Sequence, residues 1–316
     1  MPLVSVGIPT YNRPDSLARS LKSLGRQTYK RLEVIVSDNC SPGIKTQQVV
    51  AEAKKHDRRL TCFRQDKNIG ALNNFMFVLQ QATGEYFMWL ADDDRLDPGY
   101  IEQCVRYMLN HPDYTLTGGL AKYYSGSNFI ENDIMANFSQ DSAAKRVKEY
   151  YRSVIHNGIY YGVFRKDALS PMMKNCLAND WLYIAGIAFK GKVRTLPDVH
   201  IHRGRNINEK TVGDIVARMK YKGLPAKYPH LSISINVLKD ILTSETYAVL
   251  GLPRRIHLAI SCFFIIFNRY AVRHFYHFKI RRHAEIIIDR IPCARPFLKK
   301  AGGLIAGWRH KTIDKN

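Results

Sequence analysis

Acidic residues are scarce in this chain of 316 residues. Its 27 Asp and Glu stand against 48 Lys and Arg, which gives a formal net charge of +21. A surplus of this size favours a polyanionic neighbour, either nucleic acid or an anionic membrane surface. Hydrophobic residues make up 46% of the chain and charged residues 24%, which excludes a disordered protein, a collagen and a coiled coil.

Cysteines are also few, and they lie far apart. None of the six belongs to a Cys-x-x-Cys pair. This spacing argues against a disulfide framework and against a zinc site, and it predicts the reduced, mostly structural thiols of a cytosolic protein. The six positions are Cys40, Cys62, Cys104, Cys176, Cys262 and Cys293.

Long hydrophobic runs are missing as well. The longest apolar run without Lys, Arg, Asp or Glu, Ile256–Phe267, is shorter than the roughly 20 residues that a membrane span needs. The chain opens with Met1-Pro2 and a strand-like segment, without the basic start and apolar core of a secretory signal. We therefore expect a cytoplasmic protein.

Strand patterns alternate with helical periodicity over the first 120 residues. Val4–Ile8 is rich in β-branched residues, whereas Leu17, Leu21 and Leu24 recur at helical spacings. Such alternation predicts right-handed βαβ units and therefore an α/β fold, with a mostly parallel sheet flanked by helices. The expected strands are Val4–Ile8, Leu32–Ser37, Leu60–Arg64, Tyr86–Leu90 and Tyr114–Thr117, and the expected helices begin at Pro14, Ile44, Gly70 and Pro98.

The remainder of the chain differs in character, which predicts three regions with boundaries near residues 120 and 215. Residues 121–215 are less regular, with a loop at 123–128, a strand at 157–164, a helix seeded by Asp167, a helix from Asn179 to Phe189, and short strands at 193–196 and 199–202. From residue 216 onward the β pattern gives way to helices rich in basic residues.

Three adjacent acids, Asp92, Asp93 and Asp94, follow the buried strand Tyr86–Leu90. Adjacent carboxylates repel one another unless a cation neutralises them. Their hard oxygens suit Mg²⁺ or Mn²⁺, either of which would bind one or two carboxylates together with the phosphates of a ligand. The alternative interpretation is a solvated turn in which one Asp caps the next helix.

Polar motifs at the ends of several expected strands together suggest a family. Pro9-Thr10-Tyr11-Asn12-Arg13 follows the first strand, Asp38-Asn39 follows the second, Asn68-Ile69-Gly70 precedes a helix, and the Asp triplet follows the fourth strand. This order resembles the family 2 glycosyltransferases, which are inverting enzymes of the GT-A fold that use nucleotide-sugar donors. The resemblance covers roughly residues 1–205.

The resemblance implies a role for each motif. The first loop and the acid after the second strand would hold the nucleoside, with Tyr11 stacked on the base and Asp38 accepting a base N–H group. Asp92 would lie near the ribose or the uridine, and Asp94 would bind the divalent metal that holds the diphosphate. The implied donor-binding residues are Pro9, Thr10, Tyr11, Arg13, Asp38, Asn68, Gly70, Asp92 and Asp93.

The family also places a carboxylate at the start of a helix, as the general base that takes a proton from the acceptor hydroxyl. Asn179-Asp180-Trp181 occupies the equivalent place, so Asp180 is the implied base and Trp181 the implied contact for acceptor sugars. The family's usual pair of acids is reduced to one here, because Asn179 is not an acid. An N-cap role for Asp180 is the simpler alternative, and the two roles are compatible.

A segment rich in His and Arg, Val199–Asn206, resembles the family's late segment that returns over the diphosphate. His200 and His202 are two residues apart on an expected strand, so their side chains point the same way. The resemblance implies His202 as a second metal ligand and Arg203 or Arg205 as a phosphate contact, with Arg203 preferred. The alternative is a pair of ordinary surface histidines.

The basic tail suggests attachment to a membrane. Pro253–Thr312 holds 13 Lys and Arg against two acids, Glu285 and Asp289, a surplus of 11. Apolar residues recur at helical steps between Ile256 and Ala271, and Ile286–Leu298 suggests a second such stretch. Apolar and basic residues together are typical of a helix at an anionic membrane surface. A helical subdomain with a solvated basic face is the alternative.

The predicted function is an inverting glycosyltransferase at the inner face of the cell membrane. It would use a divalent metal to move a sugar from a nucleotide donor, expected to be UDP-linked, to a glycan or lipid-linked glycan during cell-surface polysaccharide assembly. The rival from another class is a nucleic-acid-binding protein, but the chain lacks RNA-binding and helix-turn-helix signatures, so no nucleic acid is expected. A nucleotidyltransferase is less favoured, because no phosphate-cradling Gly-rich loop follows the first strand.

Overall fold

The computed structural model describes residues 1–170, 173–205 and 212–272. The chain divides into two compact units, residues 1–266 and residues 267–316. Of the second unit only a π-helical turn, Phe267–Val272, is described. The predicted boundaries at residues 120 and 215 lie within the first unit, and that division into functional regions stays a prediction.

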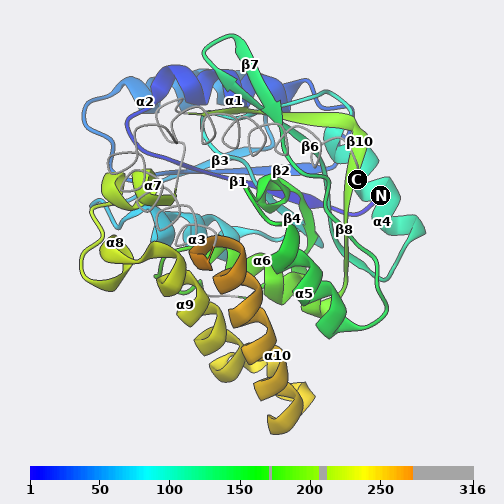
Figure 1. Ribbon diagram of the computed structural model, residues 1–316. Coiled ribbons are helices and arrows are strands. Elements are labelled where there is room, and N and C mark those ends of the chain that lie inside the picture. Colours follow the sequence, from blue (N-terminus) through cyan, green and yellow to red (C-terminus); the bar gives the residue numbers. More distant parts are fainter. Residues whose placement is uncertain (171–172, 206–211, 273–316) are drawn as a thin grey trace, which may run out of the picture. The chain divides into compact units, whose positions relative to one another are not determined.

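The first four strands form one parallel half of the sheet, in the order β3-β2-β1-β4. All seven residues of β1 are buried, as in a central strand covered on both faces. Helices α1 and α2 lie on one side of these strands and α3 on the other (Figure 1). The elements are β1 (Val4–Thr10), α1 (Pro14–Gly25), β2 (Leu32–Asp38), α2 (Lys45–His56), β3 (Leu60–Arg64), α3 (Ala71–Gln81) and β4 (Tyr86–Trp89).

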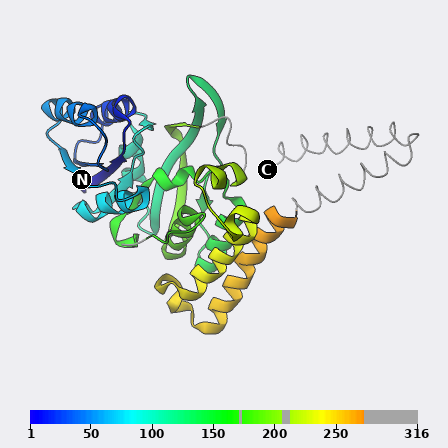
Figure 2. The ribbon, with the colours of Figure 1, turned by 90° about the vertical axis from the view of Figure 1, so that its left-hand side faces the viewer.

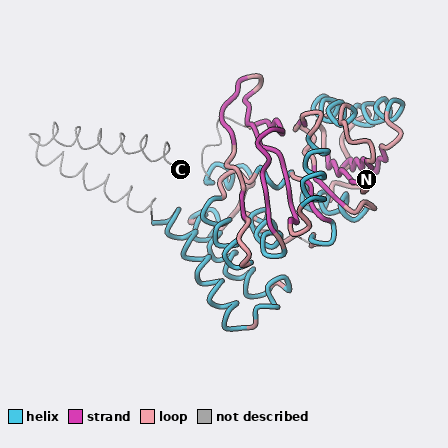
Figure 3. Tube along the Cα trace, turned by 90° about the vertical axis from the view of Figure 1, so that its right-hand side faces the viewer, coloured by secondary structure: helices cyan, strands magenta, loops and turns pink. Residues whose placement is uncertain are grey.

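The other half of the sheet is mixed. Strand β9 pairs antiparallel with both β4 and β6, whereas β10 runs parallel to β6, so that the path continues β4-β9-β6-β10-β5. The hairpin of β6 and β7 projects beyond the rest of the sheet (Figure 3). The elements are β5 (Arg95–Leu96), α4 (Tyr100–Asn110), β6 (Tyr114–Ser125), β7 (Asn128–Asn132), β8 (Asn137–Phe138), α5 (Ala143–Ser153), η1 (Gly158–Tyr161), β9 (Val163–Arg165), η2 (Lys166–Ala168), α6 (Asn179–Lys190) and β10 (Lys192–Gly204).

The expected α/β fold is therefore confirmed, and every strand and helix expected before residue 120 is present. Some expectations for 121–215 are wrong. The expected loop at 123–128 is the end of β6 and the turn into β7, which Gly126 makes with φ at +61°. The expected strand at 157–164 begins instead with the 3₁₀ turn η1, because Asn157 takes a left-handed conformation with φ at +56°.

Two further differences have local causes. The helix expected from Asp167 is only the short 3₁₀ turn η2, Lys166–Ala168. The two short strands expected at 193–196 and 199–202 are one strand, β10, whose pairing with β6 is irregular between Leu196 and His200. Pro197 lies in that irregularity, and a proline cannot donate a ladder hydrogen bond.

Helices follow β10, as predicted. They are α7 (Val212–Arg218), α8 (Leu224–Lys227), α9 (Pro229–Thr243) and α10 (Leu252–Ile266), with the 3₁₀ turn η3 (Glu245–Leu250) before α10. Helix α10 packs along α9 (Figure 2) and also contacts α5. It buries Leu258, Ala259, Cys262 and Ile266 in these contacts.

The opposite side of α10 stays exposed although it is apolar. Leu252, Ile256, Ile260 and Phe264, each four residues from the next, are between 41% and 66% exposed. We call these four residues the α10 ladder. No helix within the described residues has the length and hydropathy of a membrane span. The second apolar stretch expected at 286–298, and the basic residues from Arg273 onward, lie outside the described residues.

The five cysteines that fall within the described residues are all free, as the sequence predicts.

Candidate active site

The carboxyl ends of β1, β2 and β4 bring three of the predicted residues together. Thr10 and Asp38 are partners in the parallel register of β1 and β2. The Thr10 hydroxyl donates a hydrogen bond of 2.7 Å to Oδ2 of Asp92, just past the end of β4. All three side chains are buried or nearly so, with exposed fractions of 6% or less. Ligands of parallel sheets bind at this edge of the strands.

The three acids after β4 differ in their surroundings. Arg13 donates to Asp92 at 3.3 Å and to Asp93 at 3.0 Å, and Asp93 is exposed. Burial raises the pKa of Asp92, although the Thr10 hydroxyl and Arg13 oppose this effect. Burial raises the pKa of Asp94 to about 6, even though Arg203 acts in the other direction. A buried acid cluster of this kind gains stability from a bound cation.

Asp38 is tied to Arg64, a residue that the sequence analysis missed. Nη1 of Arg64 donates to Oδ2 of Asp38 at 2.6 Å, while the backbone N–H of Ser41 donates to Oδ1 at 2.9 Å. The register of β2 and β3 places Arg64 directly beside Asp38. The sequence indicated that these two residues are neighbours, because Asp38 directly follows one expected parallel strand and Arg64 ends the next.

The loops around Asp38 are joined to one another. Oδ1 of Asn68 accepts hydrogen bonds from the Asn39 side chain and from the backbone of Gly70, both at 2.9 Å. Gly70, with φ at +84°, precedes the first turn of α3. In the neighbouring loop after β1, the Tyr11 side chain is 45% exposed. Tyr11 follows Thr10, the register partner of Asp38, and an exposed aromatic ring at this position is suited to stacking on a nucleobase.

Asp180 lies in the first turn of α6, where the sequence predicts it. Its Oδ2 accepts a hydrogen bond of 2.9 Å from the side-chain amide of Asn157. Burial raises the pKa of Asp180, opposed by the Asn157 hydrogen bond and by Arg203. The residue is still partly accessible to solvent. Trp181 is only 8% exposed, so most of its ring packs in the interior, and its predicted contact with an acceptor stays a prediction.

Arg203 connects the acid cluster to Asp180. Its Nε donates to Oδ2 of Asp94 at 2.8 Å, and its guanidinium lies 4.0 Å from the centre of the Tyr161 ring. Tyr161 belongs to the 3₁₀ turn η1, which follows Asn157, the residue whose amide donates to Asp180. The charge of Arg203 opposes the effect of burial on the pKa of both Asp94 and Asp180. Arg205, the alternative phosphate contact, pairs instead with Glu131. Nothing in the sequence indicates the ring of Tyr161.

The two histidines of β10 share one acid. Nδ1 of His200 and Nε2 of His202 each lie 2.8 Å from an oxygen of Asp97, and Nδ1 of His202 lies 3.2 Å from the Tyr124 hydroxyl. They point the same way, as predicted, but toward Asp97. Burial would raise the pKa of Asp97, yet the hydrogen bonds of His202 and His200 outweigh it and hold that pKa below the usual range. Sequence analysis missed Asp97.

The donor set at the strand ends fits a hard divalent cation in part. Asp92, Asp93 and Asp94 offer only oxygen ligands, which Mg²⁺ and Mn²⁺ prefer. Within the described residues, no group of three His, Cys, Asp or Glu side chains is arranged to hold a metal ion by itself. One or two carboxylates plus phosphate oxygens of a ligand would complete such a site.

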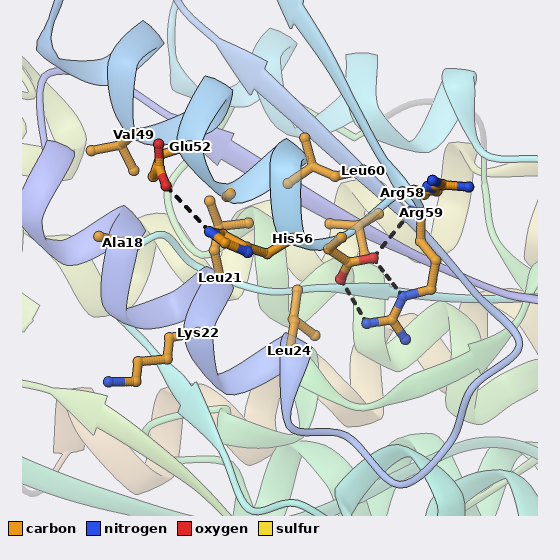
Figure 4. A pocket seen from close by; sticks show the side chains of 14 residues that line it. Ala18, Leu21, Lys22, Leu24, Val49, Glu52, His56, Arg58, Arg59 and Leu60 are labelled. Atoms are coloured by element: carbon orange, nitrogen blue, oxygen red, sulfur yellow. Dashed lines mark hydrogen bonds and ion pairs between the residues drawn. The ribbon is translucent and has the colours of Figure 1, made fainter.

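A cavity of about 710 Å³ lies elsewhere on the molecule (Figure 4). Its walls come from the later turns of α1 and α2 and from the start of β3, with Leu21, Leu24 and Leu60 inside and Lys22 at the rim. The hydrogen bonds drawn there are local, from His56 to Glu52 and from Arg59 to Asp57. None of the predicted site residues lines this cavity.

Comparison with known proteins identifies relatives in sequence and in structure. The sequence profile described as glycosyl transferase family 2 matches residues 5–172. A Campylobacter jejuni protein named GalNAc(5)-diNAcBac-PP-undecaprenol beta-1,3-glucosyltransferase is 32% identical over 178 residues, which cover 51% of this chain and 57% of that protein. The match therefore spans little more than half of that relative.

Two solved structures share the fold. TarS 1–349 of S. aureus in complex with UDP-GlcNAc superposes with a TM-score of 0.60 and 17% identity, over 84% of this chain and 73% of that one. A mannosyltransferase from Pyrobaculum calidifontis, PcManGT, in complex with GDP-Man and Mn²⁺, has a TM-score of 0.53 and 15% identity over 100% of this chain and 88% of that one. At these identities the likeness shows the fold.

Proposed function

The chain belongs to glycosyltransferase family 2 and has the GT-A fold, and on that premise we propose that it is an inverting enzyme that transfers a sugar from a UDP-linked donor to a hydroxyl of a glycan or lipid-linked glycan. One observation carries the proposal. Arg203 donates to Asp94 of the acid cluster at 2.8 Å, and its guanidinium lies 4.0 Å from the centre of the Tyr161 ring. Tyr161 belongs to the short turn η1 that follows Asn157, and the Asn157 amide donates to Asp180, the single acid of α6. A donor diphosphate and an acceptor hydroxyl can thus meet between groups suited to each.

In this proposal the nucleoside binds where β1, β2 and β3 end. Tyr11 stacks on the base, and Asp38 accepts a base N–H, of which uracil offers one. Arg64, now paired with Asp38, is suited to donate to a base carbonyl beside it. The donor residues that we propose are Pro9, Thr10, Tyr11, Arg13, Asp38, Asn68, Gly70, Asp92 and Asp93, with Arg203 for the diphosphate.

Asp94 is the proposed ligand of a divalent metal. When bound, such an ion supplies Lewis-acid stabilisation to the charge that develops on the leaving diphosphate. His202 can act as a second ligand only by exchanging its contact with Asp97 or with Tyr124 for the metal. A relative in fold, PcManGT, was solved with Mn²⁺, which supports a metal for this chain as well.

The transfer step that we propose uses Asp180 as the base. The acceptor hydroxyl oxygen attacks the anomeric carbon from the face opposite the diphosphate, its proton passes to the Asp180 carboxylate, and the bond to the diphosphate breaks with its electron pair. The raised pKa of Asp180 makes it a better proton acceptor than an exposed Asp. Arg203 lies where its charge can stabilise the departing diphosphate. Trp181 keeps its proposed contact with acceptor sugars.

We also propose that the α10 ladder attaches the enzyme to an anionic membrane surface. The ladder is apolar and exposed, and helix α10 carries Arg254, Arg255 and His257 but no acid. Apolar and basic residues together favour the headgroup region of a bilayer. The Campylobacter relative is named for an undecaprenol-linked substrate, and a lipid-linked acceptor here would give the attachment a purpose.

Nucleotide binding tests the central assignment. We expect UDP, in the presence of Mn²⁺, to raise the melting temperature, because it engages Asp38 and the acid cluster together. Thermal denaturation with UDP, GDP, dTDP and CMP, each with Mn²⁺ or with a chelator, measures this. Equal stabilisation by all four would contradict a uridine site.

A further inference from the structure

The carboxylate of Asp180 lies at the end of a chain of buried side chains. Tyr150, on α5, donates its hydroxyl to Oδ1 of Asn157 at 3.0 Å, and Nδ2 of Asn157 donates to Oδ2 of Asp180 at 2.9 Å. Tyr150 is 1% exposed and Asn157 5% exposed. An ionised carboxylate only accepts hydrogen bonds, so Asp180 fixes which end of the amide faces it, and the Tyr150 hydroxyl takes the other end.

The backbone holds Asn157 in place for this contact. Its φ of +56° lies in the left-handed region, which Asn tolerates better than most residues. Next to it, the backbone N–H of Gly158 donates to Oδ2 of Asp133 at 2.5 Å. A Cβ on Gly158 would lie 2.5 Å from that same oxygen and 2.5 Å from Cβ of Ala121, so only glycine fits. The turn therefore has little freedom to withdraw Asn157 from Asp180.

The same turn is linked to the arginine of the donor site. The Tyr123 hydroxyl donates to Oδ2 of Asp133 at 3.2 Å, and the Tyr123 ring lies 5.7 Å from the guanidinium of Arg203. Asp133 thus joins the loop that carries Asn157 to the side chain that flanks Arg203. The proposed base and the proposed phosphate contact are positioned by one connected set of residues.

We propose that Asn157 is a positioning residue for the glycosyl-transfer reaction: it orients the Asp180 carboxylate and favours its ionised form, and Tyr150 fixes the Asn157 amide. This inference rests on the proposed function, in which Asp180 is the base. A base must be ionised before it can take a proton, and a buried acid is less readily ionised. A hydrogen bond donated to the charged form offsets that effect of burial.

Other groups around Asp180 do not replace this contact. The backbone N–H groups of Trp181 and of Asp180 itself, and the charge of Arg203, also favour the ionised form, but each does so less than the Asn157 hydrogen bond. Among the residues that the structure describes, the other titratable groups that interact with Asp180 are a thiol and three phenols, all neutral near pH 7. They are Cys176, Tyr160, Tyr161 and Tyr221.

The test is a titration of Asp180 itself, in the full chain labelled with ¹³Cγ-Asp. The Asp180 resonance is identified by its loss in Asp180→Asn. Asn157→Gly removes the amide and accepts the left-handed backbone, so we expect the Asp180 midpoint to rise by about one to two pH units. Tyr150→Phe should move it in the same direction by less. Asn110→Gly, at the exposed end of α4, is the matched control and should leave it unchanged.

An unchanged midpoint in Asn157→Gly would overturn the inference. If that variant does not fold, a midpoint in Tyr150→Phe equal to that of the wild type would overturn it. A measurement of turnover with the donor distinguishes a failure of this inference about Asn157 from a failure of the proposal that Asp180 is the base. If Asp180→Asn retains wild-type turnover, the assignment of the base fails, whereas the titration still decides whether Asn157 controls that carboxylate. If Asp180→Asn is inactive, we expect Asn157→Gly to lose kcat at neutral pH and regain it at higher pH.

Discussion

Lowering the pH below 6 should weaken metal-dependent donor binding, because a proton and a cation compete for Asp94. The carboxyl is 1% exposed, and burial raises its pKa to about 6 although Arg203 opposes the shift. A metal ligand has to be deprotonated to bind. At pH 5 only about one molecule in eleven carries the ionised form, so the apparent affinity should be about tenfold weaker than at pH 7, or about 1.4 kcal/mol.

Calorimetric titration with UDP-GlcNAc and Mn²⁺ at pH 5, 6, 7 and 8 measures this effect. A nucleotide sugar is a better probe than UDP, because each of its phosphates carries one ester and one anhydride linkage and has no group that titrates in this range. The raised pKa of Asp92 acts in the same direction. Asp94→Asn is the control, and its residual binding should depend little on Mn²⁺. Equal affinity at pH 5 and pH 7, or full Mn²⁺-dependent binding by Asp94→Asn, would refute the reasoning.

Two further predictions concern the base and the membrane surface. Asp180→Asn removes the proton acceptor and should lower kcat by roughly 10²- to 10⁴-fold while donor affinity is kept. Release of nucleoside diphosphate in the presence of membrane lipid extract measures kcat. Turnover near the wild-type rate would exclude Asp180 as the general base. The combined change Ile256→Ser, Ile260→Ser and Phe264→Ser should lower binding to vesicles with anionic lipid at least tenfold, because each side chain loses the energy of burial in the bilayer. Flotation of the protein with vesicles measures this binding, and Leu109→Ser, which changes an exposed apolar residue of α4, is the control. Unchanged flotation of the triple variant would contradict membrane attachment through the α10 ladder.

Local patterns were enough to predict the first half of the sheet. Val4–Thr10, Leu32–Asp38 and Tyr86–Trp89 are buried strands, and each carries its polar residues at or just beyond the carboxyl end. Parallel strands bring such ends to one edge, so the meeting of Thr10, Asp38 and Asp92 followed from the order of the elements. The bounds of these strands differ from the predicted ones by two residues or fewer.

The second half depended on contacts that are distant in sequence. Residues 157–161 have the composition of a strand, but Asn157 is held left-handed by its partners Tyr150 on α5 and Asp180 on α6. The next residue, Gly158, is held by the side chain of Asp133. Tertiary contacts override a local preference in such segments. Asp97 was missed for the same reason, since its partners His200 and His202 follow more than 100 residues later.

The side-chain pairing of the charged residues could not be predicted either. The sequence places two arginines and two histidines near the end of β10, and any of them could face the acid cluster. Strand alternation separates His202 from Arg203, and the structure brings Arg203 to Asp94 and both histidines to Asp97. The resemblance could suggest a metal ligand at His202, but only the fold could show that its ring nitrogens already have partners.

The most direct measurement is the thermal stability of the protein with UDP and Mn²⁺, compared with GDP, dTDP and CMP and with a chelator. At 100 times its dissociation constant, a specific ligand should add about 2.7 kcal/mol to the free energy of unfolding. For a chain of this length, that corresponds to an increase of several degrees in Tm. We predict this increase for UDP with Mn²⁺, and its loss in Asp94→Asn or with the chelator. No change in Tm with any of the four nucleotides, with the metal present, would contradict a nucleotide-sugar site at the strand ends.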